Sequence, residues 1–279
     1  MKYDPIKRSL GEVFNKSPFL RKTFYSMLDL LLLRTWHVKD EFRKWAKNNK
    51  GKEANILDAG SGFGQYSYFM SGMDNKWTVK GVDVKTEQIA DCNNFFETIG
   101  RNNAHFEKAD LVKFSEPEKY DFILSVDVME HILEDVQVFK NFYNSMKTGG
   151  TLLVSTPSDQ GGSDVHDHDH DHDHDHADGE DSFIDEHVRD GYNIDEIQEK
   201  LKSVGFSKTS ARYTYGTPGK ISWKLSMKYP ILMLNASKIF FIILPFYYIL
   251  TFPFSLILNY MDLKGNHKTG TGLNVVAVK

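Results

Sequence analysis

Three alternating glycines that follow a short apolar run and an acid constrain the fold more than any other feature of this chain. Residues 56–58 are Ile-Leu-Asp, the glycines are Gly60, Gly62 and Gly64, and residues that can start a helix come next. Glycine lets the backbone approach a ligand closely, and the first turn of a helix offers unpaired N–H groups at the positive end of its dipole. The pattern therefore indicates a strand-to-helix turn that holds a nucleotide-type ligand.

Strand-like and helical segments alternate after this turn. Apolar residues at helical spacing predict one helix over 86–100 and another that runs from Asp127 through Met146 to a stop at Gly149-Gly150. The strand-like runs are residues 77–82, 105–111, 120–126, 151–155, 206–215 and 272–278. Strict alternation of strand and helix predicts an α/β fold with a parallel, doubly wound sheet.

At this point the chain resembles the class I S-adenosylmethionine-dependent methyltransferases. The resemblance covers roughly residues 30–216 plus the last strand, and it rests on ordered motifs at 58–64, Asp83, 109–111, 125–132 and 149–157. It implies a Rossmann-like, doubly wound, seven-stranded sheet that is parallel except for an antiparallel last strand. The segment Glu130-His131 is similar to the quinone-pathway branch of small-molecule methyltransferases.

The resemblance also implies a role for each motif residue. The glycines would line the methionine part of S-adenosylmethionine above Asp58, Asp83 would hold the ribose, Val84 would pack on the adenine and Asp110 would accept from the adenine amino group. The full set expected around the cofactor is Asp58, Gly60, Ser61, Gly62, Gly64, Asp83, Val84, Ala109, Asp110, Leu111 and Val126. A nicotinamide dinucleotide would suit Asp83 equally well, but the Gly-x-Gly-x-Gly spacing and the acid before the first glycine favour S-adenosylmethionine.

Methyl transfer from a sulfonium is an in-line displacement, so alignment and exclusion of water matter more than any single catalytic group. Asp127 would border the sulfonium and the acceptor. A hydroxyl acceptor is helped by a base, for which His131, His187 and His37 are the candidates. The alternatives are a backbone-bonded helix residue for His131 and, for His187, a surface loop with an Asp185–Arg189 pair.

The N-terminal region predicts a helical cap over residues 1–50, ahead of a methyltransferase domain at 51–279. Apolar and aromatic residues recur at helical spacing from Pro18 to Trp45, with lysines and arginines between them. In related enzymes such a segment covers the cofactor, so Trp36 and His37 are expected near it, although most of these aromatic residues would form core.

A loop insertion at 161–182 contains histidines that alternate with aspartates. Imidazoles at this density bind divalent metals such as zinc or nickel, and the ligands would be His166, His168, His170, His172, His174 and His176. Nothing rigid fixes their coordination, so the alternative is a solvated loop with incidental metal affinity.

A second, apolar insertion at 217–265 includes residues 239–261, which carry no charge. Its length would span a membrane, but the strands expected on both sides return to one sheet, which excludes a single crossing. Pro245 and Pro253 predict two or three short helical pieces. With lysines on both flanks, the insertion is expected to make peripheral contact with a membrane through 239–261; the alternative is a buried cap or dimer contact.

Composition indicates an intracellular enzyme. The chain of 279 residues has a net charge of −4 and one cysteine, so no internal disulfide can form. We expect a cytoplasmic monomer or homodimer, peripheral on the inner face of the membrane, with no visible signal peptide and no nucleic-acid partner.

The sequence therefore predicts methyl transfer from S-adenosylmethionine to a small lipophilic acceptor at oxygen, such as a quinone precursor, a phenolic compound or a lipid. Two alternatives from other classes are a methyltransferase-like membrane-binding module without turnover and a metal-handling protein that uses the His-Asp tract.

Deletion of residues 166–176 is expected to leave the affinity for S-adenosylmethionine unchanged, because the tract lies outside the cofactor motifs. Calorimetric titration of the deletion variant and the full chain would check this. A large loss of affinity would show that the tract supports the cofactor site.

Overall fold

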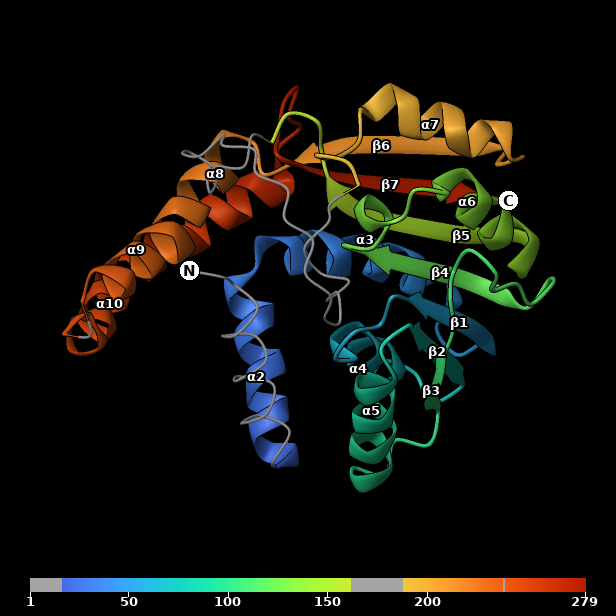
Figure 1. Cartoon of the computed structure of the whole chain (residues 1–279), viewed down its shortest axis with the longest axis horizontal. Helices are drawn as coiled ribbons and strands as arrows, with labels where there is room; N and C mark the ends of the chain where they lie inside the picture. The colour runs from blue at the N-terminus through green and yellow to red at the C-terminus, as the bar shows by residue number, and fades with distance from the viewer. Residues whose placement is uncertain (1–16, 162–187, 238) are drawn as a thin grey trace, which may run out of the picture.

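The computed structural model describes residues 17–161, 188–237 and 239–279, and its centre is a seven-stranded sheet (Figure 1). The strand order is β3-β2-β1-β4-β5-β7-β6. The first five strands are parallel, and β7 runs antiparallel to both β5 and β6, which confirms the predicted Rossmann-like, doubly wound sheet. The strands are β1 (Ala54–Ala59), β2 (Trp77–Asp83), β3 (Ala104–Lys108), β4 (Tyr120–Val126), β5 (Met146–Pro157), β6 (Lys208–Thr214) and β7 (Gly272–Val278).

Helices pack on both faces of the sheet because the central strands are apolar on both sides. In β1, for example, Ile56 and Leu57 point to opposite faces and both are fully buried. One face is covered by α3 (Leu33–Asn49), α4 (Gln65–Ser71) and α5 (Thr86–Thr98), and the other by α6 (Asp135–Ser145) and α7 (Ile194–Ser203). The cap helix α2 (Pro18–Leu31) precedes α3 and starts with a cap from Ser17, whose hydroxyl accepts from the Phe19 N–H.

The helix predicted from Asp127 to Met146 is shorter than expected at both ends. A short 3₁₀ turn, η1 (Met129–His131), comes first, α6 begins at Asp135, and Met146 already belongs to β5. Met146 is fully buried and is the register partner of Tyr120 in β4. Pairing within the sheet therefore overrides the helical spacing of the apolar residues.

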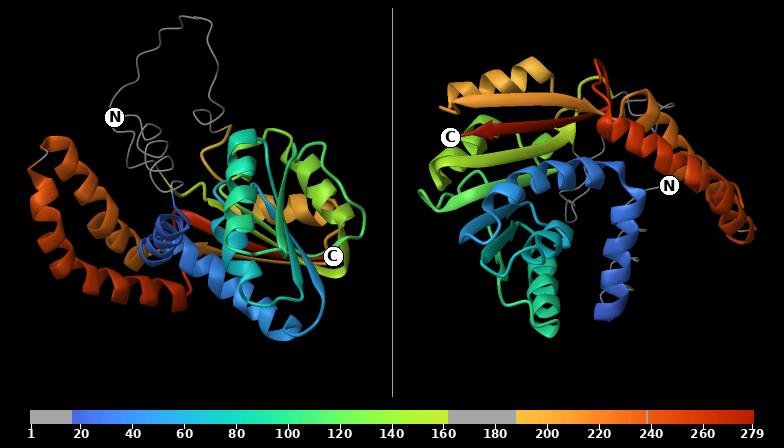
Figure 2. Two further views of the ribbon diagram at one scale, coloured as in Figure 1. Left: turned by 90° about the horizontal axis from the view of Figure 1, so that it is seen from below. Right: turned by 180° about the vertical axis from the view of Figure 1, so that it is seen from behind.

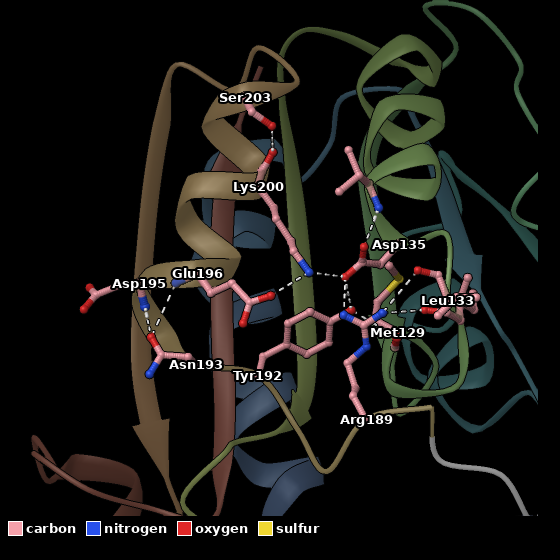
Figure 3. Close-up of polar contacts among 12 residues, drawn as sticks. Met129, Leu133, Asp135, Arg189, Tyr192, Asn193, Asp195, Glu196, Lys200 and Ser203 are labelled. Atoms are coloured by element: carbon pink, nitrogen blue, oxygen red, sulfur yellow. Dashed lines mark hydrogen bonds and ion pairs between the residues drawn. The ribbon is translucent and has the colours of Figure 1, made fainter.

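Buried polar contacts hold the chain where it re-enters the described structure after residue 187 (Figure 3). The carboxylate of Asp135, at the start of α6, accepts from Lys200 Nζ at 2.8 Å and from Tyr192 Oη at 2.8 Å, and it pairs with Arg189. Burial alone would raise the pKa of Asp135, but the hydrogen bonds from Lys200 and Tyr192 and the charge of Arg189 hold it below its ordinary value. This cluster joins α6 to α7 and fixes residues 189–192, which lead into α7.

The apolar insertion forms a helical hairpin between β6 and β7, made of residues 217–264. Its outgoing arm is α8 (Thr217–Trp223), the π-helical turn η2 (Lys224–Lys228) and α9 (Tyr229–Ala236), and its returning arm is α10 (Phe240–Lys264). Figures 1 and 2 show this hairpin extending away from the sheet, beyond the ends to which the parallel strands point.

The prediction that two prolines break the returning arm into short pieces is wrong. Pro245 and Pro253 both lie inside the single helix α10, which curves (Figure 2). A proline removes one backbone hydrogen bond and bends a helix, but the remaining bonds of a 25-residue helix hold it together.

Replacing Asp135 with asparagine is expected to lower the free energy of unfolding by about 2 kcal/mol at pH 7, because hydrogen bonds to a charged group are lost. Since the pKa of Asp135 is lowered in the folded chain, its carboxylate stabilises the fold above the ordinary pKa and loses this effect as the pH falls below it. Denaturant unfolding of both proteins should show the difference shrinking below about pH 4. Glu199→Gln, an exposed change on α7, is the control; an equal loss there would contradict the assignment.

Candidate active site

The glycine turn between β1 and α4 has a backbone that only glycine adopts without strain. The φ angles of Gly60, Gly62 and Gly64 are 82°, 49° and 74°. A Cβ atom on Gly60 would lie 2.1 Å from Cγ2 of Val128. A side chain is therefore excluded at Gly60 by Val128, and the positive φ angles disfavour any other residue at all three glycine positions.

Asp83, at the end of β2, is hydrogen-bonded to this turn. Its Oδ2 accepts from the Gly62 N–H at 2.9 Å, and its Oδ1 accepts from the Lys85 N–H at 3.0 Å. Each carboxylate oxygen can accept a second hydrogen bond, so the group is placed and still able to bind hydroxyls. The Gly60 and Ser61 N–H groups donate to the Val82 carbonyl at 2.8 and 2.9 Å, which ties the turn to β2.

Asp58 lies below the turn and supports it from inside. It is 2% exposed, and its Oδ2 accepts from the Ser67 hydroxyl of α4 at 2.6 Å. Burial raises the pKa of Asp58 to about 6. Because it is enclosed, Asp58 positions the start of α4 relative to β1.

The residues predicted to surround an adenine lie on neighbouring strand ends. Asp83 pairs with Lys108 in the sheet, which brings residues 109–111 beside it, and the Ala109 N–H donates to the Asp83 carbonyl at 3.0 Å. Val84 is 44% exposed, Leu111 is buried, and Asp110 is exposed and accepts from the Val112 N–H at 3.0 Å. An exposed apolar side chain and an exposed carboxylate thus lie on neighbouring strand ends.

Asp127 occupies the end of β4, across the glycine turn from Asp83. Its φ of 55° is unusual for a residue other than glycine, and such backbone is common at functional sites. One oxygen, Oδ2, forms an ion pair with Arg34 of α3; the other, Oδ1, is buried and has no partner among the described residues. Asp127 therefore has one carboxylate oxygen able to accept a hydrogen bond, at the strand end next to the glycine turn.

The sequence analysis missed Arg34, which pairs with Asp127, and Tyr215, which is bonded to Arg34. The Arg34 N–H donates to the Tyr215 hydroxyl at 2.9 Å, and Tyr215 follows β6 with a φ of 55°. Burial raises the pKa of Tyr215. Neither residue lies in a motif, and 181 positions separate them, so no local pattern could have identified the pair.

The cap covers the glycine turn, but through different residues from those predicted. Arg21 and Tyr25 of α2 both donate to the Phe63 carbonyl, Arg21 at 2.8 Å. His37, which was a base candidate, is 1% exposed, and its Nε2 lies 2.8 Å from Oδ1 of Asp262 at the base of the hairpin. Burial lowers the pKa of His37. The expectation that His37 lies at the cofactor is wrong, because the buried carboxylate of Asp262 holds it elsewhere.

Of the remaining catalytic candidates, the structure describes His131 but not His187. His131 is half-buried in η1, four residues after Asp127, and its N–H donates to the Val128 carbonyl at 3.0 Å. Arg189 is bound to Asp135, so it is not available at the acceptor side. His187 and the six histidines of the 161–182 insertion lie outside the described residues, and within the described ones no group of three or more metal-binding side chains is assembled.

One cavity among the described residues lies away from this site. It has a volume of about 440 Å³ and is lined by residues at the amino ends of β4 and β5, including Asp121, Thr148 and Gly150. The parallel strands place the glycine turn, Asp83 and Asp127 at their carboxyl ends, where ligands bind in open α/β sheets.

Comparison with known sequences identifies a methyltransferase domain over residues 50–203. Relatives include phosphoethanolamine N-methyltransferase 1 of Triticum aestivum, 30% identical over 40% of this chain and 25% of that protein. (S)-Coclaurine N-methyltransferase of Papaver somniferum is 26% identical over 53% of this chain and 39% of its own. Ubiquinone biosynthesis O-methyltransferase of Paraburkholderia phytofirmans is 28% identical over 36% of this chain and 43% of its own. The chain thus spans less than half the length of each of these relatives.

Solved structures share the fold at low sequence identity. Haemonchus contortus phosphoethanolamine N-methyltransferase 2 in complex with S-adenosyl-L-methionine has a TM-score of 0.57 and 18% identity, over 92% of this chain and 60% of that one. The cyclase SpnF has a TM-score of 0.53 and 13% identity, over 86% of this chain and 81% of its own, so the fold alone does not define the reaction. Because the methyltransferase domain matches more than half of the sequence, the chain belongs to the methyltransferase-domain family.

Proposed function

We propose that this methyltransferase transfers the methyl group of S-adenosylmethionine to a small lipophilic acceptor, at an oxygen atom. The observation that carries the proposal is the glycine turn held by Asp83 at the carboxyl edge of the sheet, directly across from the Arg34–Asp127 pair. One side of this edge fits a nucleoside, and the other side offers polar groups to a second molecule.

The residues present fit the cofactor. Gly60 is packed against Val128, but a Cβ on Gly62 would meet nothing nearer than Gln88 Oε1 at 4.0 Å, so the backbone at Gly62 is open to a ligand. The Ser61 hydroxyl is buried without a partner among the described residues, which leaves a donor for a bound polar group. Asp83 would hold the ribose, while Val84 and Asp110 would contact the adenine. When bound, S-adenosylmethionine supplies an electrophilic methyl group on a sulfonium.

The acceptor side combines a polar head site with an apolar approach. Arg34, Asp127 and the Tyr215 hydroxyl supply charge and hydrogen bonds to the acceptor's polar group. Next to Tyr215, a seam of about 10 Å³ between the cap and the hairpin is lined by Leu31, Leu32, Leu33, Trp223 and Met227 together with Ser222, Ser226 and Asn259. The seam is too small for the lipophilic part of an acceptor, so that part of the proposal is supported by the exposed apolar side chains of the adjoining hairpin.

The named relatives include both N-methyltransferases and an O-methyltransferase, so they do not distinguish between the two acceptor atoms. The choice of atom is therefore argued from the residues of the site. An oxygen acceptor must lose a proton as it attacks, and His131 lies on the turn that follows Asp127. We therefore keep oxygen as the proposed atom, in an acceptor such as a quinone precursor, a phenolic compound or a lipid. Nitrogen methylation is the alternative that most of the named relatives favour.

The proposed location is the cytoplasm, at the inner face of a membrane. The single cysteine supports a reducing compartment: Cys92 is buried, and burial raises its pKa to about 12, so it behaves as an apolar core residue. Metal binding by the His-Asp tract stays a prediction from the sequence, as does the choice between monomer and homodimer.

Asp83→Ala is expected to weaken the binding of S-adenosylmethionine by roughly 10- to 100-fold, because hydrogen bonds to a carboxylate are lost and the Gly62 N–H loses its acceptor. Isothermal calorimetry with the full chain would measure this. The control is Glu87→Gln, which also removes one negative charge but at an exposed position; this variant should bind S-adenosylmethionine normally. Failure of the unmodified chain to bind either S-adenosylmethionine or S-adenosylhomocysteine would overturn the assignment.

His131→Gln is expected to lower kcat by roughly 10²- to 10⁴-fold with unchanged cofactor affinity, since general-base catalysis is worth that much. The assay would use methyl-labelled S-adenosylmethionine with a lipid extract, and mass spectrometry would identify the labelled atom. His105→Gln on β3 is the control, because His105 is exposed and lies away from Asp127 along the sheet. Label on nitrogen, or an unchanged kcat, would reject oxygen methylation with His131 as the base.

A further inference from the structure

The outer face of α10 is an apolar surface that the rest of the described chain leaves uncovered. Its most exposed apolar side chains are between 58% and 70% exposed; they begin at Ile239, just before the helix, and recur along it at intervals of one to four residues. They are Ile239, Phe241, Ile242, Phe246, Ile249, Leu250, Phe254, Ile257 and Tyr260. An apolar surface of this length is rarely left in contact with water.

The inner face of α10 is polar, so the helix has the reverse of the usual arrangement in a soluble domain. Ser255, Asn259 and Asp262 are buried, and the Ser255 carbonyl accepts from the Ser222 hydroxyl of α8 at 3.1 Å. Farther along, the Tyr247 and Tyr248 hydroxyls donate to backbone carbonyls of η2 at 2.7 and 2.9 Å. Three hydroxyls thus bond across the two arms, whereas the Ser255 hydroxyl and the Asn259 amide oxygen are buried without a partner among the described residues. Apolar side chains are presented to the outside.

Charge in this region is almost entirely positive. Residues 217–268 include one acid, Asp262, which is fully buried against His37. The same residues include the lysines Lys220, Lys224, Lys228, Lys238, Lys264 and Lys268. Two copies of this hairpin packed together would bring like charges close, whereas acidic lipid headgroups would complement them. The charge therefore favours an anionic bilayer over a second copy as the occupant of this surface.

The topology restricts how a bilayer can be engaged. Among the described helices, α10 alone is long and apolar enough to cross a membrane, and only 11% of its most apolar stretch is buried. The two arms begin and end on β6 and β7, which are hydrogen-bonded neighbours in the sheet. The outgoing arm carries three lysines within 220–228, so it cannot serve as a second crossing.

From these observations we propose that the hairpin binds one leaflet of an anionic membrane. The outer face of α10 lies in the interface, and the lysines of the hairpin contact the lipid headgroups. This interface-lying mode suits a helix whose apolar stripe runs along its whole length. The proposal stands apart from the identity of the acceptor, because the hairpin contacts the membrane whether or not the acceptor is a lipid.

The test is flotation of the full chain with vesicles of phosphatidylcholine, with and without phosphatidylglycerol. The unmodified chain should float with the anionic vesicles and less with the neutral ones. The double variant Phe246→Gln/Leu250→Gln removes two exposed side chains from the stripe and should reduce binding by roughly tenfold or more. Lys224→Gln/Lys228→Gln should reduce it by roughly fivefold per lysine and make it less dependent on salt.

The matched control is Leu133→Gln/Val136→Gln, which replaces exposed apolar residues near α6 and should float like the unmodified chain. Calorimetric affinity for S-adenosylmethionine reports on the fold and the cofactor site in each variant, and it should not change. Equal flotation of the stripe variant would overturn the proposal. So would an unmodified chain that stays in solution and forms a dimer, by sedimentation, which the stripe variant abolishes.

Discussion

The site depends on the hydrogen bonds that hold the glycine turn against the end of β2. Two N–H groups of the turn donate to the Val82 carbonyl and a third donates to Asp83, so the turn is fixed by the strand that also carries the acid proposed to hold the ribose. The left-handed backbone that these bonds require is available only because the turn is built of glycine. Without this turn, Asp83 and Asp127 would be acidic residues at the ends of two strands with no backbone between them to contact a ligand.

A second buried group joins the elements that distinguish this chain from a minimal methyltransferase. The Asp262 carboxylate, on α10, accepts from the Tyr215 and Gly219 N–H groups at 3.1 and 3.0 Å and is bonded to His37 of the cap. Burial would raise the pKa of Asp262, but the hydrogen bond from His37 and nearby positive charge hold it below its ordinary value. A buried carboxylate with this many donors is fully satisfied, so it fixes the base of the hairpin instead of weakening it.

The sequence predicts the parts of the fold that local pattern controls. The seven strands and their sheet follow from apolar runs, glycines and acids whose spacing is visible along the chain. Met146 was misassigned because helical spacing and strand pairing compete there, and only the contact with Tyr120 decides between them. The proposed acceptor side was found in part: Asp127 lies in a motif, but Arg34, which pairs with it, and Tyr215, which is bonded to Arg34, are 181 positions apart. His37 shows the converse error, because a histidine in a promising segment was bound by a carboxylate that sequence could not place beside it.

The same residues connect the hairpin to the acceptor side. Tyr215 donates its N–H to Asp262 and accepts from Arg34 through its hydroxyl, and Arg34 pairs with Asp127. A displacement at the base of the hairpin would therefore be felt at Asp127. Regulation by a membrane would require a second stable arrangement of these groups, whereas the structure shows one arrangement with the Asp262 carboxylate fully bonded. The contacts are accordingly best understood as fixing the distance between the proposed membrane surface and the active site, which suits an acceptor that approaches from a lipid interface.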